Sequence, residues 1–227
     1  MTEEIEHTWI DVDIPMVLER IPTDAKSLLD LGCGRGIIGA ICRCYRDIER
    51  LVGIDIYQPY LNRVSKFRLY DEVIKRDLNK TLPFKDNSFE IVTAAEVVEH
   101  LEKKKALNLI KEMERVTSRK VIITTPNFFR QQNGYDNNEY QKHLSVINWK
   151  EFSKMGYQVY GCGGFVPFGI VIPKLHTPLK FLNYLTPRFA VDIIAVKEIE
   201  KYQQNPTYSV QSNRFPESVR CTDRTNA

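Results

Sequence analysis

Short apolar runs alternate with amphipathic segments along most of this chain. The runs have the length and the β-branched and aromatic content of buried strands, and they lie at 27–31, 51–55, 73–75, 89–95, 120–125, 157–160 and 189–196. Apolar residues at helical spacing predict helices at 5–21, at 36–45, from 59 onward, at 103–117 and at 149–155. Strands that alternate with helices are typical of an α/β domain whose sheet is mainly parallel.

We predict a single domain over residues 1–200. Two segments within it and one after it lack this alternation of strands and helices. The segment 127–144 is polar and has no periodicity, and long loops of this kind are usually functional or disordered. The segment 165–187 is apolar but carries several prolines, and we expect it to be an insertion between the last two strands. Residues 201–227 are polar without a core pattern, which predicts a disordered tail.

Composition narrows the class of protein. The chain has 227 residues and a net charge of +3, which is too small to argue for nucleic acid or membrane binding by itself. Its apolar runs are too short for a transmembrane helix, and its first residues lack the layout of a signal peptide. The five cysteines form no C-x-x-C pair, which indicates reduced thiols and a cytoplasmic location. No oligomeric state is predicted.

A glycine loop with the sequence DLGCGRG, residues 30–36, joins the first strand to its helix. Glycines permit close approach of the backbone to a ligand, and the start of a helix offers free N–H groups. Residues 34–39 match the G-x-G-x-x-G pattern of dinucleotide sites. However, Asp30 would repel a pyrophosphate, whereas it suits a cationic amino group. This charge favours S-adenosylmethionine, whose methionine end carries an ammonium.

The run from Leu28 to Gly36 resembles the first motif of the class I S-adenosylmethionine-dependent methyltransferases. A second run, LPFKDNSFEIV at 82–92, is similar to the family's lead into its fourth strand, with Glu90 where aspartate is usual. The resemblance covers about residues 25–160 and is to methyltransferase type 11 and the ubiquinone-pathway O-methyltransferases. It implies a Rossmann-like, seven-stranded, mostly parallel sheet with helices on both faces and the last strand antiparallel.

The same resemblance implies an S-adenosylmethionine site at the carboxyl ends of the strands, where open α/β sheets bind ligands. Asp55 would accept hydrogen bonds from the ribose hydroxyls, and Asp77 would accept one from the adenine amine. The other interpretations are a helix N-cap for Asp55 and a capping or surface acid for Asp77. The residues that we expect at the cofactor are Asp30, Gly32, Cys33, Gly34, Gly36, Asp55, Ile56, Asp77, Leu78 and Ala95.

The run EVVEHL after the fourth strand carries the candidate chemistry. As a helical turn it would place Glu96, Glu99 and His100 on one face. We expect Glu96, His100 and His143 to face the methyl acceptor, with His143 as a candidate general base. Glu-x-x-Glu-His with a later histidine also resembles the small-RNA 3′-terminal 2′-O-methyltransferases. That resemblance implies a divalent metal held by Glu96, Glu99, His100 and His143, although we favour a pocket without metal.

The sequence leaves the acceptor open between two classes. A small-molecule or lipid-like acceptor, methylated on oxygen or nitrogen, is favoured because 165–185 could form an apolar lid or a surface element that touches a membrane. The other interpretation of this segment is ordinary core packing of a connection between the last two strands. An RNA acceptor would use stacking groups such as Phe128, Phe129 and Tyr135, but the lysines at 103–105 are mixed with acids and suit a solvated helix face. A non-catalytic member that binds only cofactor or a partner protein is the alternative of a different class.

Overall fold

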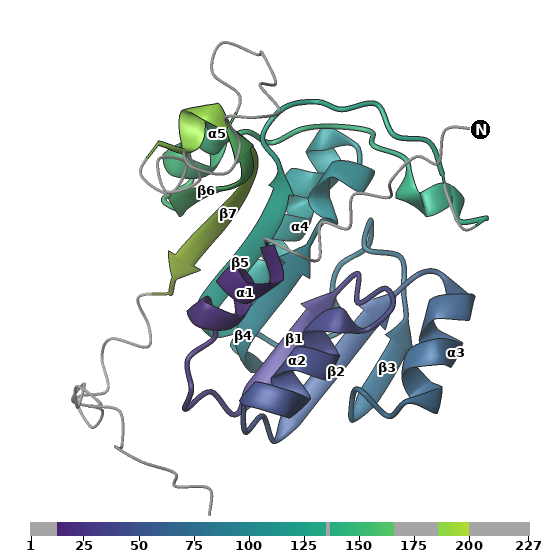
Figure 1. The fold of residues 1–227 in the computed structure, drawn as a ribbon. Coiled ribbons are helices and arrows are strands. Elements are labelled where there is room, and N and C mark those ends of the chain that lie inside the picture. Colours follow the sequence, from purple (N-terminus) through teal and green to yellow (C-terminus); the bar gives the residue numbers. More distant parts are fainter. Residues whose placement is uncertain (1–12, 135–136, 166–185, 200–227) are drawn as a thin grey trace, which may run out of the picture.

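The computed structural model describes residues 13–134, 137–165 and 186–199, and within them one seven-stranded sheet forms the centre (Figure 1). The strands lie in the order β3-β2-β1-β4-β5-β7-β6. Their bounds are β1 Ser27–Leu31, β2 Arg50–Asp55, β3 Glu72–Lys75, β4 Phe89–Ala95, β5 Thr117–Pro126, β6 Gln158–Phe165 and β7 Ala190–Glu198. The last strand, β7, is antiparallel to both β5 and β6, and the other pairs are parallel. The predicted fold class is confirmed.

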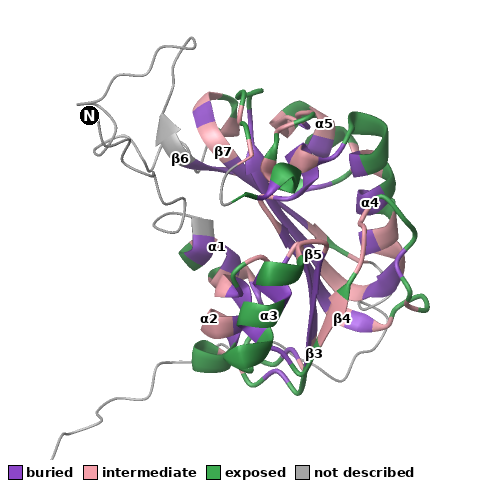
Figure 2. Cartoon of the chain, turned by 90° about the vertical axis from the view of Figure 1, so that its right-hand side faces the viewer, coloured by how far each residue is buried: buried purple, intermediate pink, exposed green. Residues whose placement is uncertain are grey.

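Helices cover both faces of the sheet (Figure 2). The α-helices of the described part are α1 Asp13–Arg20, α2 Ile37–Tyr45, α3 Gln58–Lys66, α4 Lys103–Val116 and α5 Trp149–Lys154. Short 3₁₀ turns are η2 Val98–His100, η3 Glu139–Gln141 and η5 Pro187–Phe189. Apolar residues of α1, α2 and α3 form one buried cluster against the sheet, and those of α4 and α5 form another. This division follows from the amphipathic patterns, since each helix buries its apolar stripe against the nearer face.

The elements depart from the predicted bounds at their ends. Helix α1 begins at Asp13 in the described part, and the earlier residues of the predicted 5–21 helix lie outside it. Strand β6 continues to Phe165, past the predicted end at residue 160. Its glycines have low strand propensity, but hydrogen bonds to β7 hold this segment in the sheet. Most of the 165–187 insertion and all of the 201–227 tail lie outside the described residues.

Helix α5 shows why local sequence fixes its position. Asn148 accepts hydrogen bonds from the backbone N–H groups of Lys150 and Glu151, and Glu151 closes the reciprocal capping box. Gly156 follows the helix with a φ of +83°, the left-handed conformation with which many helices end. None of the helices in the described part has the length and apolar character needed to cross a bilayer.

Candidate active site

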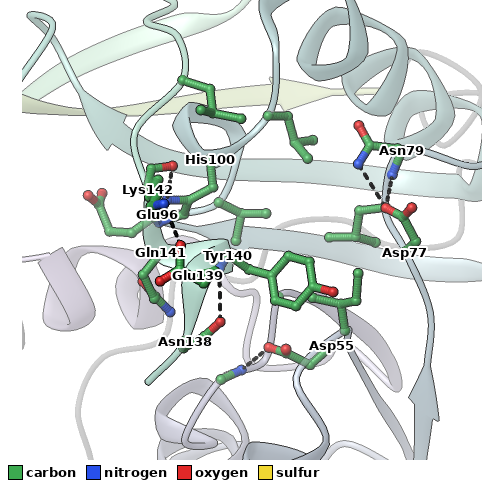
Figure 3. Close-up of a pocket in the computed structure, with 17 residues that line it drawn as sticks. Asp55, Asp77, Asn79, Glu96, His100, Asn138, Glu139, Tyr140, Gln141 and Lys142 are labelled. Carbon is green, nitrogen blue, oxygen red and sulfur yellow. Dashed lines mark hydrogen bonds and ion pairs between the residues drawn. The ribbon is translucent and has the colours of Figure 1, made fainter. Parts of the chain in front are cut away.

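A cavity of about 380 Å³ lies at the carboxyl ends of β1, β2 and β4 (Figure 3). Six of the residues predicted at the cofactor line it: Gly32, Gly34, Asp55, Ile56, Asp77 and Leu78. Glu96 and His100, two of the residues predicted at the acceptor, line it as well. The structure therefore brings part of each predicted group to one cavity, while His143, the third residue predicted at the acceptor, does not line it.

The glycine loop presents backbone rather than side chains to this cavity. Gly32 and Gly34 have φ values of +65° and +49°, in the left-handed region that favours glycine. A Cβ on Gly32 would lie only 2.5 Å from Cγ2 of Val97, whereas one on Gly34 would meet nothing closer than 3.8 Å. The space into which a Gly32 side chain would project is thus filled by Val97, whereas the corresponding space at Gly34 is open.

Asp55 ties the end of β2 to the glycine loop. Its Oδ2 accepts a hydrogen bond from the Gly34 N–H at 2.8 Å, and its Oδ1 accepts one from the Tyr57 N–H at 2.8 Å. Burial raises the pKa of Asp55, and these backbone N–H groups oppose the rise. The N-cap residue of α3 is Tyr57, so the interpretation of Asp55 as a helix N-cap is wrong.

Asp77 forms a local turn at the other end of the cavity. Its Oδ1 accepts hydrogen bonds from the backbone N–H of Asn79 at 2.9 Å and from the Asn79 side-chain amide at 2.8 Å. Figure 3 shows this pair on the opposite side of the view from Glu96 and His100. Asn79 lines the cavity, and sequence reasoning missed it although Asp-x-Asn is a common turn signal.

Four residues predicted at the cofactor do not line the cavity: Asp30, Cys33, Gly36 and Ala95. Asp30 is 1% exposed, and it accepts hydrogen bonds from the Tyr70 hydroxyl at 2.6 Å and from the Thr93 hydroxyl at 2.8 Å. Burial raises the pKa of Asp30 to about 7 against the effect of both hydroxyls. Burial also raises the pKa of the Cys33 thiol. The predicted contact of Asp30 with an ammonium stays a prediction.

The predicted helical turn over Glu96, Glu99 and His100 is wrong in its first residue. Glu96 has a φ of +54°, and its N–H donates to the carbonyl oxygen of Thr124 at 3.1 Å, so the 3₁₀ turn begins only at Val98. As a result the two glutamates do not share a face. Glu96 lines the cavity, whereas Glu99 is 1% exposed and its Oε2 accepts a hydrogen bond from the Thr125 hydroxyl at 2.9 Å.

Glu99 instead lies with the two histidines. One candidate ligand atom from each of Glu99, His100 and His143 lies within 4.8 Å of the others, and Glu96 is not part of this group. The two imidazole centroids are 5.1 Å apart. Among the residues that the structure describes, Glu99 Oε1 has no hydrogen-bond partner although it is buried. The cluster therefore has an unpartnered carboxyl oxygen at its buried end.

Backbone carbonyls fix the orientation of both imidazoles. His100 Nδ1 is 3.1 Å from the carbonyl oxygen of Lys142, and His143 Nδ1 is 2.8 Å from that of Arg130. A carbonyl oxygen can only accept, so each Nδ1 is assigned the hydrogen, and in a neutral ring Nε2 keeps its lone pair. Burial lowers the pKa of His143, although the charge of Glu99 opposes this.

Comparison with known proteins identifies a methyltransferase domain in part of the chain. Residues 29–124 match the family model described as a methyltransferase domain. The matched residues, less than half of the chain, are similar to that domain, and the similarity supports a class I S-adenosylmethionine-dependent methyltransferase. The match supports the predicted family and confirms the predicted enzyme class and cofactor.

Three similar proteins share less than 30% sequence identity with this methyltransferase. The uncharacterized protein MJ0638 of Methanocaldococcus jannaschii is 29% identical over 183 residues, which are 77% of this chain and 75% of that protein. A SAM-dependent methyltransferase from Archaeoglobus fulgidus has a TM-score of 0.55 at 18% identity, over 82% of this chain and 91% of that chain. One from Mesorhizobium loti has a TM-score of 0.54 at 14% identity, over 81% and 96%. At these identities the structures support the fold alone.

The polar segment 127–144 supplies the part of the methyltransferase site that sequence reasoning missed. Asn138, Glu139, Tyr140, Gln141, Lys142 and Leu144 all line the cavity. Asn127 anchors the start of the segment, since its side-chain amide donates to the carbonyl oxygens of Pro187 and Ala190. Leu144 anchors its end through an N–H bond of 2.8 Å to the Glu99 carbonyl. In the view of Figure 3 the Tyr140 ring lies between the Glu96 side and the Asp55 side.

Proposed function

We propose that this methyltransferase moves a methyl group to an oxygen or nitrogen of a small-molecule or lipid-like acceptor, with Glu96 and His100 facing the acceptor and His143 as the general base. The observation that carries the proposal is the single cavity lined both by Gly34, Asp55 and Asp77 and by Glu96 and His100. Donor and acceptor groups held in one cavity meet the main requirement of methyl transfer, which is alignment.

The residues present fit S-adenosylmethionine. A cavity of about 380 Å³ lies within the size range of small-molecule sites. Both oxygens of Asp55 accept backbone N–H groups in the structure, and the carboxylate, with about four lone-pair sites, can also accept a ribose hydroxyl. Both bonds of Asp77 go to Oδ1, which leaves Oδ2 for the adenine amine. When bound, the cofactor supplies a methyl group already activated by the sulfonium.

His143 has the protonation state that a base requires. Its lowered pKa keeps the ring neutral near pH 7, and the Arg130 carbonyl holds Nδ1–H, so Nε2 is the atom that would take a proton. The carboxylate of Glu99 would stabilise the imidazolium formed in this way. His100 has the same backbone restraint through the Lys142 carbonyl and itself lines the cavity, which suits a residue that orients the acceptor.

The lining of the cavity favours a small or lipid-like acceptor over RNA. Apolar side chains of Val97, Leu101 and Leu144 line it together with the 55%-exposed ring of Tyr140. Lys142 is the single cationic side chain among the described residues that line it. A nucleic-acid backbone would call for several cations near the site.

A metal-assisted transfer is the second candidate, and one observation favours it specifically. Glu99, His100 and His143 bring a buried carboxylate and two imidazoles within ligand distance, and Glu99 Oε1 lacks a partner in the described structure. Oxygen and nitrogen ligands of this kind suit divalent transition metals. These three residues would hold the ion, which would lower the pKa of an acceptor hydroxyl. Glu96 lies outside the group, so the predicted ligand set is reduced from four residues to three.

The testing experiment is a transfer assay with labelled S-adenosylmethionine over separate pools of small molecules, lipids and RNA. We expect label in the small-molecule or lipid pool. Replacing His143→Asn should reduce turnover by about 10²–10⁴-fold and leave cofactor affinity unchanged, while Gln131→Ala, an exposed change on the same segment at a residue that does not line the cavity, should have no effect. Label only in RNA, or no label in any pool, would contradict the proposal.

Chelation separates the two candidates. Full turnover of the extensively chelated enzyme eliminates the metal-assisted mechanism. The metal-assisted mechanism is supported, and the metal-free one refuted, if chelation abolishes turnover, a divalent ion restores it, and Glu99→Gln causes the same loss.

A further inference from the structure

Tyr70 is a buried residue that the site described above does not use. It lies between α3 and β3, and its hydroxyl makes two hydrogen bonds. It donates to Asp30 Oδ2 at 2.6 Å and accepts from the N–H of Gly39 at 3.1 Å. Asp30 is the first residue of the glycine loop, and Gly39 lies in the first turn of α2, just after the loop. One hydroxyl therefore connects the two ends of the loop.

The bond to Gly39 replaces a cap that helix α2 lacks. The first N–H groups of an α-helix have no partner within the helix, and a side chain at the N-cap usually accepts from one of them. The N-cap of α2 is Gly36, which has no side chain and makes no side-chain cap bond. The Tyr70 hydroxyl accepts from Gly39, the third residue of the helix, so it takes the place of the missing cap.

Two glycines make room for the Tyr70 ring. A Cβ on Gly39 would lie 2.6 Å from the ring atom Cζ, and a Cβ on Gly53 in β2 would lie 3.1 Å from the ring atom Cδ1. Real Cβ atoms rarely approach a neighbour so closely, so the ring occupies a position that any larger residue at either site would disturb. The tyrosine is thus fitted between β2 and α2, and it packs in a defined orientation.

We propose that Tyr70 is a positioning residue for the cofactor: its hydroxyl ties Asp30 to the first turn of α2 and holds the glycine loop in the conformation that receives S-adenosylmethionine. The inference rests on the proposed cofactor site. Tyr70 does not line the cavity, and it acts only through the loop. Thr93 from β4 donates to the other oxygen of Asp30 at 2.8 Å but does not reach α2, so it lacks the bridging role.

The charged state of Asp30 makes the proposal testable through the pH dependence of cofactor affinity. The titratable groups that face Asp30 are Asp55 from β2, Tyr70, and the thiols of Cys33 and Cys42, whose pKa values burial raises so that they stay neutral. Burial raises the pKa of Asp30 itself to about 7, and the Tyr70 hydrogen bond opposes that rise. Removing the hydroxyl should therefore raise the pKa of Asp30 further and shift the pH dependence of cofactor affinity upward.

The experiment compares Tyr70→Phe with Tyr157→Phe. Tyr157 is also buried, and its hydroxyl donates to the Glu114 carboxylate at 2.9 Å, away from the glycine loop. Both changes remove one buried hydroxyl next to a carboxylate and keep the ring, so the two stability losses should be similar. Only Tyr70→Phe should weaken the calorimetric affinity for S-adenosylmethionine, by about three- to tenfold, and shift its pH profile. Equal affinity and identical pH profiles for the two variants overturn the inference.

Two further outcomes are distinguished by the same measurements. Wild-type protein that does not bind S-adenosylmethionine refutes the proposed cofactor site and the inference with it. If Tyr70→Phe does not fold, amide hydrogen exchange of the wild-type protein without cofactor decides. We expect slow exchange at Gly39, and exchange there as fast as in an unprotected peptide contradicts the bridge.

Discussion

Replacement of Gly32 by alanine tests the shape of the glycine loop most directly. Two costs arise from the structure. The φ of +65° is one that L side chains rarely adopt, which costs about 1–2 kcal/mol. The added methyl group would also lie 2.5 Å from Val97 Cγ2 and 3.4 Å from Val97 Cβ. Because valine is β-branched and stiff at χ1, rotation cannot relieve both contacts, and overpacking adds about 1–3 kcal/mol.

We therefore expect Gly32→Ala to lower the free energy of unfolding by about 2–5 kcal/mol. Gly34→Ala is the matched control. It carries the same kind of strain at a φ of +49° but meets nothing closer than 3.8 Å, so it should cost only about 1–2 kcal/mol. Val97→Ala separates the two terms, since in that background Gly32→Ala should cost no more than Gly34→Ala does.

The assay is urea unfolding of the four proteins and of the double variant, without cofactor. A coupling energy between residues 32 and 97 of more than about 1 kcal/mol is expected from their contact. The reasoning is refuted if Gly32→Ala and Gly34→Ala destabilise equally, or if Val97→Ala leaves the cost of Gly32→Ala unchanged. Calorimetry of the same proteins should find weaker cofactor binding for Gly34→Ala than its small stability loss explains, because Gly34 lines the cavity.

Three other outcomes follow from the same contacts. Asp55→Ala should weaken S-adenosylmethionine binding by about 10–100-fold in calorimetry, because hydrogen bonds to a charged group contribute most; an unchanged affinity would remove its ribose role. Burial raises the pKa of Asp30 to about 7 from its usual 3.8, so the contribution of Asp30 to stability should be complete below about pH 4 and be lost as the pH rises through 7. Urea midpoints against pH should flatten over this range in Asp30→Asn, and an unaltered profile would contradict the assignment. Phe152→Ala should cost about 3–5 kcal/mol in thermal or urea unfolding, since its side chain is fully buried under α5, and a cost below 1 kcal/mol would be inconsistent with that packing.

The fold could be predicted because its signals are local. Buried parallel strands are short apolar runs, and the helices between them carry an amphipathic stripe, so both types were found close to their observed bounds. The misses lie where tertiary pairing overrides local preference. Strand β6 continues through Gly161 because β7 pairs with it, and β5 begins at Thr117 rather than at 120 because Phe89 of β4 pairs there.

The site was predicted only where residues directly follow a strand. Asp55 and Glu96 line the cavity because the carboxyl ends of β2 and β4 lie at one edge of the sheet. The positive φ of Glu96 could not be foreseen, since it depends on hydrogen bonds from its N–H to Thr124 of β5. Likewise, Tyr140 reaches the cavity because hydrogen bonds to residues distant in sequence hold both ends of the segment 127–144. Such contacts produce no periodic pattern in the sequence, so they could not be predicted from it.

Strand β7 has a consequence for synthesis of the chain on the ribosome. It lies between β5 and β6, and β6 pairs with no other strand of the described sheet. Until residues 190–198 have left the exit tunnel, the nascent chain carries β5 as an open edge strand and β6 without a partner, an arrangement prone to intermolecular pairing. Every residue that lines the cavity has by then been translated. The catalytic half of the sequence is thus exposed to aggregation until a strand that contributes nothing to the cavity completes the sheet.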